Sequence, residues 1–270
     1  MPLMNVGDAE IAYELYDFTE PWTSGRAPVL LLHGLGGDRV TWLYQVREFC
    51  REFPVITVDL RGHGLSSKAE RDFTIAEMAR DVARLLREVG IERVHAVGLS
   101  MGGMVAQQLA VDHPHAVASL VLVDTACGIP AQFAAAARTA LELIENNTMA
   151  TVATARITAA FSDAVDPVVR NYFIDRVARN DKASYDRAAR ATYGFDVRSR
   201  LGEIRVPTLV VVGAEDRTLP PPLSEELAAC IEGAQLVRID GAAHLSNVEQ
   251  PQEFNRSVLE FLRSASQLFR

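Results

Sequence analysis

The chain of 270 residues has few cysteines, no long apolar run and no excess of positive charge. Its three cysteines, Cys50, Cys127 and Cys230, form no CxxC pair, and an odd number cannot close a disulfide framework. We therefore expect a reducing, cytoplasmic location. Apolar stretches such as residues 29–32 and 208–212 are far too short to cross a bilayer, and the N-terminal residues lack the basic start and apolar segment of a signal peptide.

Basic residues are also in short supply. Lys and Arg number 27 against 35 Asp and Glu, which gives a formal net charge of −8. A nucleic-acid-binding protein usually carries a basic face, and the sequence contains no run of Lys or Arg that would form one. It also contains no HExxH or CxxC motif, no P-loop and no GxGxxG after a strand. We therefore expect no metal, no cofactor, and no nucleic-acid or membrane partner.

Short β-rich runs alternate with helical patterns along most of the chain. Hydrophobic residues make up 49% of it, which is enough for a sizeable core, and the length suits one domain with an insertion. We expect strands at residues 11–16, 29–32, 55–58, 94–97, 120–123, 208–212 and 236–239. The alternation predicts an α/β fold, in which a mostly parallel twisted sheet has helices on both faces.

One segment interrupts this alternation. Residues 126–200 contain no strong strand pattern, and Ala-rich helical stretches such as 133–145 and 149–161 dominate them. We predict that residues 126–200 form a helical cap over the sheet, and that residues 1–125 and 201–270 form the core. Such a cap would cover a crevice at the sheet edge and exclude water from it.

A serine between two glycines provides the strongest functional signal. Residues 98–102 read Gly-Leu-Ser-Met-Gly, follow a predicted strand and begin a predicted helix, which is the context of a nucleophile elbow. The turn is so sharp that the positions two before and two after the serine must have almost no side chain. It would raise the Ser100 hydroxyl above the sheet edge, close to the N–H groups that begin the helix.

A serine hydroxyl needs a base to take its proton, and that base needs an acid to orient it. His244 follows the last predicted strand, so it should lie at the same sheet edge as Ser100. Asp216 ends the preceding strand and is the acid we favour. Glu215 and Asp124 also follow strands and stay open as alternatives. The chain order serine, aspartate, histidine is the order of the α/β-hydrolases.

Backbone N–H groups would be needed to stabilise an oxyanion in such a site. The N–H of Met101 is positioned by the elbow, and a second should come from the glycine-rich loop after residue 32, where Leu35 fits best. The residues near these loops and the aromatic residues of the cap predict a substrate pocket made of His33, Gly34, Trp42, Phe133 and Phe161.

Several motifs together resemble the α/β-hydrolase superfamily. They are His-Gly-Leu-Gly at 33–36, Asp-Leu-Arg-Gly-His-Gly-Leu-Ser at 59–66, the elbow at Ser100, and the segments 213–216 and 241–244. Within it, the chain is most similar to the 3-oxoadipate enol-lactonase and carboxylesterase group. The similarity implies that a small-molecule ester or lactone is cleaved by a Ser-His-Asp triad through an acyl-enzyme.

The resemblance also has a departure and leaves alternatives. Enol-lactonases carry tryptophan in the cap, whereas both tryptophans here, Trp22 and Trp42, precede it. Hydrolases of C–C bonds in β-diketones and cofactor-free haloperoxidases share the triad, and ligand-binding relatives keep the fold without catalysis. A homo-oligomer is compatible with all of these. Arginines are frequent in the cap, and one that faced the pocket would pair with a substrate carboxylate, although the sequence does not distinguish which.

Overall fold

A mostly parallel sheet forms the centre of this computed structural model, which describes residues 2–20 and 26–268. Trp22 lies outside the described residues. Within them the sheet has eight strands in the order β1-β2-β4-β3-β5-β6-β7-β8. Their bounds are β1 Leu3–Asn5, β2 Glu10–Tyr16, β3 Val29–Leu32, β4 Val55–Asp59, β5 Val94–Leu99, β6 Val117–Val123, β7 Thr208–Gly213 and β8 Gln235–Ile239.

Strand direction brings the predicted site residues to one edge. β1 and β2 pair antiparallel, as do β2 and β4, whereas every pairing from β4 to β8 is parallel. The carboxyl ends of β3, β5, β6, β7 and β8 therefore point the same way, and the loops that follow them meet. β3, β5, β6 and β7 are buried along their whole length, as expected for strands covered on both faces. The α/β prediction is confirmed.

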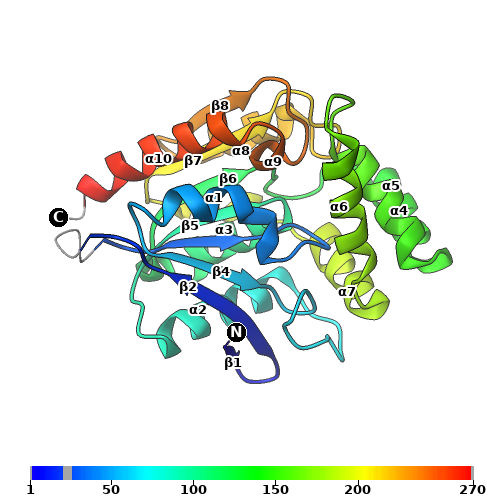
Figure 1. The fold of residues 1–270 in the computed structure, drawn as a ribbon, viewed down its shortest axis with the longest axis horizontal. Coiled ribbons are helices and arrows are strands. Elements are labelled where there is room, and N and C mark those ends of the chain that lie inside the picture. Colours follow the sequence, from blue (N-terminus) through cyan, green and yellow to red (C-terminus); the bar gives the residue numbers. More distant parts are fainter. Residues whose placement is uncertain (1, 21–25, 269–270) are drawn as a thin grey trace.

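Helices cover both faces of the sheet (Figure 1). α1 (Leu43–Phe49) and α10 (Pro251–Gln267) pack on one face, and α2 (Ile75–Glu88), α3 (Met101–Asp112) and α8 (Pro221–Cys230) pack on the other. The pleat of β3 divides its side chains between these layers, because Leu30 and Leu32 join the core on the α2 and α3 side while Val29 and Leu31 join the core on the α1 and α10 side.

Four further helices lie between β6 and β7 and form what we call the helical insertion: α4 Ala134–Asn146, α5 Met149–Ala160, α6 Pro167–Ala178 and α7 Lys182–Tyr193. They gather at one end of the sheet (Figure 1). The two ends of the segment that contains the insertion lie side by side, since the Val197 N–H donates to the Cys127 carbonyl at 2.9 Å and Gly128 forms a β-bridge with Asp196. The insertion falls inside residues 126–200, where the helical cap was predicted.

The remaining elements are short. They are α9 (Ser246–Glu249) and the 3₁₀ helices Arg39–Trp42, Pro114–Ala116, Ala131–Phe133 and Arg198–Glu203. β1 was not predicted, because three residues are too few to form a recognisable alternation. α8 begins at Pro221, within a run of three prolines, because proline is well tolerated in the first helical turn. No helix of residues 2–20 and 26–268 is long and apolar enough to span a bilayer.

Phe254 of α10 provides a test of the packing on the α1 and α10 face. Its ring lies 6.3 Å from that of Trp42, between centroids, and neither side chain has exposed surface. We expect Phe254→Ala to lower the free energy of unfolding by about 3–5 kcal/mol, because it removes a large buried ring and leaves a cavity. Urea denaturation measures this. The control Phe18→Ala removes a ring that is 72% exposed and should change stability little; equal effects would contradict the packing.

Candidate active site

Ser100 occupies a strained turn between β5 and α3. Its backbone has φ 53° and ψ −117°, which non-glycine residues seldom adopt. Hydrogen bonds from both sides hold it there: the Ser100 N–H donates to the Val123 carbonyl at 2.9 Å, and the Thr125 hydroxyl donates to the Ser100 carbonyl at 2.7 Å. The side chain therefore stands at the carboxyl edge of the sheet, partly exposed.

The glycines at 98 and 102 are required by close backbone contacts. A Cβ at Gly98 would lie 2.3 Å from the Gly102 carbonyl oxygen, and a Cβ at Gly102 would lie 2.2 Å from the Leu32 carbonyl oxygen. Neither position can hold a larger residue unless the backbone shifts. The first contact allows the sharp turn, and the second presses α3 against the end of β3.

The structure brings Ser100, His244 and Asp216 together in one hydrogen-bonded line. Ser100 Oγ lies 3.0 Å from His244 Nε2, and His244 Nδ1 lies 2.8 Å from Asp216 Oδ2. The other Asp216 oxygen accepts from the N–H groups of Thr218 and Leu219 at 2.8 and 3.0 Å. The exposed fraction is 7% for His244 and 3% for Asp216. The line therefore opens to solvent at its serine end.

The alternative acids have other surroundings. Glu215 is exposed. Asp124 is buried, and its Oδ1 accepts from the Gly213 N–H at 2.8 Å while its Oδ2 accepts from the Ser246 hydroxyl at 2.6 Å and the Ser246 N–H at 3.2 Å. It therefore links the end of β7, which leads to Asp216, with the loop that carries His244. Burial, and next the charge of Asp216, raise the pKa of Asp124 to about 7.

Neighbouring charges set the protonation of His244. Burial acts to lower its pKa, but the charge of Asp216 and the hydrogen bond to it outweigh burial, so the pKa lies above its usual value of 6.5. Asp124 adds to this increase. The charge of Arg156, in the helical insertion, acts in the opposite direction.

Two backbone N–H groups beside Ser100 are available to a bound molecule. In the part of the chain that the structure describes, neither Leu35 N–H nor Met101 N–H donates to a protein acceptor. Met101 begins α3, where helical N–H groups have no partner within the helix. The loop that carries Leu35 passes close to the serine, because a Cβ at Gly34 would lie 3.3 Å from Ser100 Cβ.

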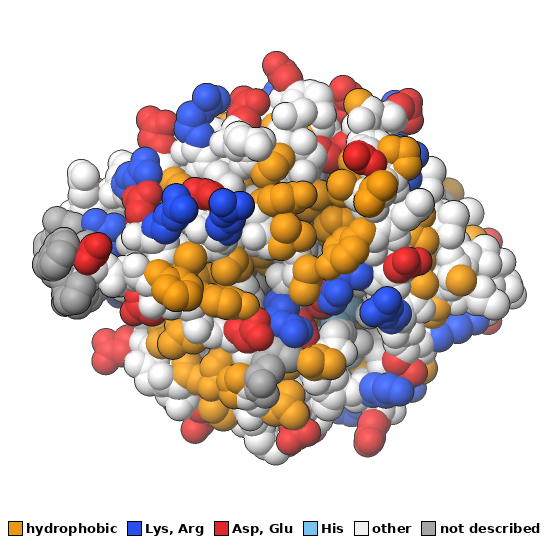
Figure 2. Space-filling view, in the orientation of Figure 1, with side chains coloured by type: hydrophobic (Ala, Val, Ile, Leu, Met, Phe, Trp, Pro, Cys, Tyr) orange, Lys and Arg blue, Asp and Glu red, His pale blue; other side chains and the backbone are white. Residues whose placement is uncertain are grey.

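The helical insertion holds that loop in place. Asn180 Nδ2 donates to the Gly36 carbonyl at 2.8 Å, and Arg176 Nε donates to Asp38 at 3.0 Å. The Tyr185 ring packs so closely on Gly36 that a Cβ there would lie 2.6 Å from it. Apolar side chains gather between α9 and α6, where the insertion meets the body of the fold (Figure 2).

Two of the residues predicted to form a pocket, Gly34 and Phe161, lie close to Ser100 or His244. Gly34 is beside Ser100. Phe161 is buried against Phe173, with ring centroids 5.5 Å apart, and directly follows Ala160, whose carbonyl accepts from the His244 N–H at 2.9 Å. Phe133 is half-buried just before α4. Their contact with a substrate stays a prediction.

The structure corrects the pocket prediction for His33 and Trp42. Both side chains have no exposed surface, so neither can line a crevice that a substrate enters. His33 Nε2 accepts from the Leu60 N–H at 2.9 Å and its Nδ1 lies 2.8 Å from the Gly34 carbonyl, so the ring holds two loops together. Trp42 belongs to the core beneath α10. Proximity along the sequence to the loop at 33–37 does not reveal this burial.

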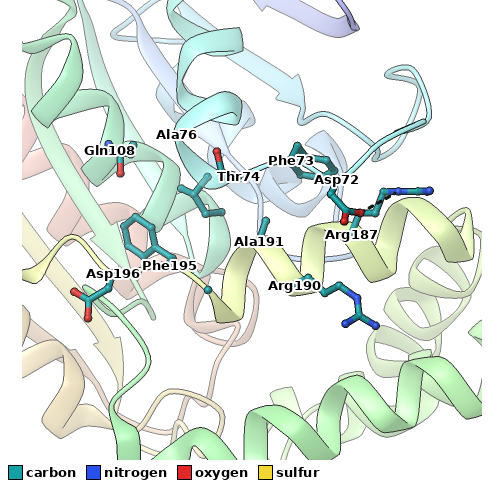
Figure 3. A pocket seen from close by; sticks show the side chains of 12 residues that line it. Asp72, Phe73, Thr74, Ala76, Gln108, Arg187, Arg190, Ala191, Phe195 and Asp196 are labelled. Atoms are coloured by element: carbon teal, nitrogen blue, oxygen red, sulfur yellow. Dashed lines mark ion pairs between the residues drawn. The ribbon is translucent and has the colours of Figure 1, made fainter.

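A separate hollow of about 330 Å³ lies between the start of α2, α3 and α7 (Figure 3). Its arginines, Arg187 and Arg190, pair with Asp72 and Asp186, and it includes none of the predicted site residues. Among the described residues, no group of three or more His, Cys, Asp and Glu is arranged to hold a metal ion.

Comparisons with known proteins agree with the observed fold. A family model described as the alpha/beta hydrolase fold matches residues 27–251. 3-oxoadipate enol-lactonase 1 of Acinetobacter baylyi is 32% identical over 243 residues, which cover 88% of this chain and 90% of that protein. The solved enol-lactonase of Burkholderia xenovorans LB400 is 30% identical with a TM-score of 0.90, covering 97% of this chain and 100% of that one. A thermophilic esterase of Thermogutta terrifontis is 31% identical with a TM-score of 0.86, covering 96% and 94%.

The charge of Asp124 provides a test of the electrostatics. We expect Asp124→Asn to lower the pKa of His244, because the substitution removes a carboxylate that favours the protonated ring. NMR titration of the His244 ring protons measures the shift. The control Asp240→Asn removes an exposed carboxylate from the same stretch of chain and should leave that pKa in place. An unchanged or higher pKa in Asp124→Asn would contradict the assignment.

Proposed function

The chain belongs to the alpha/beta hydrolase family, and from this premise we propose that it is a serine hydrolase that cleaves a small carboxylic ester or lactone through an acyl-enzyme. The observation that carries the proposal is the line from Ser100 Oγ through His244 to Asp216, with contacts of 3.0 and 2.8 Å. The free N–H groups of Leu35 and Met101 beside it support the same chemistry.

In the first half-reaction, Ser100 Oγ attacks the carbonyl carbon while His244 Nε2 takes its proton. Asp216 keeps the Nδ1 proton on the far side of the ring and stabilises the imidazolium that forms. The N–H groups of Leu35 and Met101 donate to the oxyanion of the tetrahedral intermediate. The C–O bond to the leaving oxygen then breaks, and His244 returns the proton to that oxygen.

In the second half-reaction, His244 removes a proton from water, which attacks the acyl-enzyme and releases the carboxylic acid. Ser100 regains its proton from His244. For an ester, the alcohol has already left. For a lactone, the new hydroxyl stays attached to the acyl group, so a single hydroxy acid is released at the end.

The similarity to known enzymes favours esters and lactones over C–C bonds or halogenation. The relatives named above include two enol-lactonases and an esterase, each at least 30% identical to this chain. We also propose that residues 126–200 act as a cap over the site. Asn180 and Arg176 support this, because their hydrogen bonds hold the loop that carries Leu35. A cytoplasmic location is also part of the proposal, and the unpaired state of all three cysteines supports it.

Substitution of the triad tests the proposed function. We expect wild-type protein to hydrolyse p-nitrophenyl acetate with a burst of one nitrophenolate per site, and Ser100→Ala or His244→Ala to lower kcat by about 10⁴- to 10⁶-fold. The control His115→Ala removes an exposed histidine and should retain full activity. Circular dichroism confirms that each variant is folded. Folded Ser100→Ala that hydrolyses the ester at the wild-type rate would contradict the proposal.

The pH profile gives a second test. The base must be neutral, and the pKa of His244 is raised above 6.5. We therefore expect kcat/KM to fall as the pH decreases, with an apparent pKa above 6.5, because protonation of His244 removes the base. Steady-state rates across the neutral and acidic range measure this. A profile that stays flat well below pH 6.5 would argue against His244 as the base.

A further inference from the structure

The arginines of the helical insertion differ in what they contact. Arg176, Arg187 and Arg190 form ion pairs with Asp38, Asp72 and Asp186. Arg138 and Arg179 are exposed, and Arg170 Nη2 donates to the Ser162 carbonyl at 3.0 Å. Arg170 and Arg156 are both partly buried, and among the described residues no carboxylate oxygen lies within 4.0 Å of the guanidinium nitrogens of either. We consider Arg156 because its helix ends beside His244.

Arg156 lies on the inward side of α5, where the neighbouring Val152, Ala153 and Ile157 are buried. Ala160, one helical turn further along α5, accepts the hydrogen bond from the His244 N–H at 2.9 Å. The guanidinium is near enough to His244 for its charge to lower the pKa of the ring. Its Nη1 donates to the Tyr193 hydroxyl at 2.7 Å, and Tyr185, which packs on the loop of Leu35, is also close.

The carboxylates of this region do not neutralise Arg156. Asp216 uses one oxygen for His244 and the other for two backbone N–H groups. Asp124 uses one for the Gly213 N–H and the other for Ser246. Every oxygen of the two side chains therefore has a donor other than Arg156. What Arg156 has is the Tyr193 hydroxyl, a neutral partner that orients the guanidinium and leaves its charge uncompensated.

When a guanidinium is partly removed from water and has no counter-ion, its positive charge is poorly compensated. Its planar array of N–H donors suits a carboxylate that binds through two oxygens. We propose that Arg156 is a specificity-determining residue that binds a carboxylate of the substrate, so that the preferred ester or lactone is an anion with its charge a few bonds from the scissile carbonyl. This inference rests on the proposed function and names its substrate class.

Matched substrate pairs test the assignment. One pair is mono-p-nitrophenyl succinate and p-nitrophenyl butanoate, with the charge on the acyl side; the other is m-carboxyphenyl acetate and phenyl acetate, with the charge on the alcohol side. We expect wild-type kcat/KM to favour the anion in at least one pair by about 10- to 100-fold, mostly through KM, because a charge-assisted hydrogen-bond pair has that range of energy.

Arg156→Gln should abolish that preference, because it lowers kcat/KM for the anion far more than kcat/KM for the matched neutral ester, which does not contact the guanidinium. It should also raise the apparent pKa of the acidic limb, because a charge that disfavours protonation of His244 is removed. Arg138→Gln, which removes an exposed arginine of the same insertion, is the control and should keep the preference. If Arg156→Gln does not fold, Arg156→Lys keeps the charge without the two-pronged geometry and should reduce the preference several-fold.

The outcomes separate this inference from the proposed function. Ser100-dependent hydrolysis without preference for either anion, or a preference that survives Arg156→Gln, would overturn the role of Arg156 and leave the hydrolase proposal standing. No hydrolysis of any ester would overturn the hydrolase proposal. Calorimetric measurement of monomethyl succinate binding then tests the role of Arg156 independently of turnover. Ser100→Ala should bind monomethyl succinate, and the double variant Ser100→Ala, Arg156→Gln should not. Equal binding by both would overturn the assignment.

Discussion

The close approach of backbone at the two glycines around Ser100 is the constraint on which the rest of the site depends. The Gly102 position lies against the Leu32 carbonyl, so α3 starts directly beside the loop that follows β3. That contact brings the free N–H groups of Met101 and Leu35 to the same side of the serine. The φ of Ser100 costs on the order of 1–3 kcal/mol of strain, which its hydrogen bonds with Val123 and Thr125 help to offset.

Charge is arranged around this turn by loops that are distant in sequence and adjacent at the sheet edge. Asp124 follows the strand next to the elbow and holds both the end of β7 and the loop of His244 through Gly213 and Ser246. The carboxylates of Asp216 and Asp124 therefore favour protonation of the imidazole, and the guanidinium of Arg156 opposes it. The same guanidinium that moderates the base is the group we assign to substrate recognition.

Local patterns were sufficient to predict the fold and to place Ser100, His244 and Asp216 at one sheet edge, because turn sterics fix the glycine spacing at Ser100 and parallel strands bring successive loops to one edge. The identity of the acid was harder, since Asp124 and Asp216 both follow strands and only the loop geometry separates them. Trp42 was predicted to line the pocket because it is near the loop at 33–37 in sequence, whereas its burial depends on Phe254, more than 200 residues away. Arg156 could not be singled out, because the sequence does not reveal which arginines of the insertion lack an ion-pair partner in the fold.

Covalent labelling tests the central claim most directly. A fluorophosphonate reacts with a serine only when a neighbouring base activates the hydroxyl, so the folded protein should acquire one phosphonyl group, located by peptide mass spectrometry at Ser100. The rate of labelling should fall steeply in folded His244→Ala. A label on another residue, or a rate at Ser100 that is independent of His244, would contradict an activated serine at this turn.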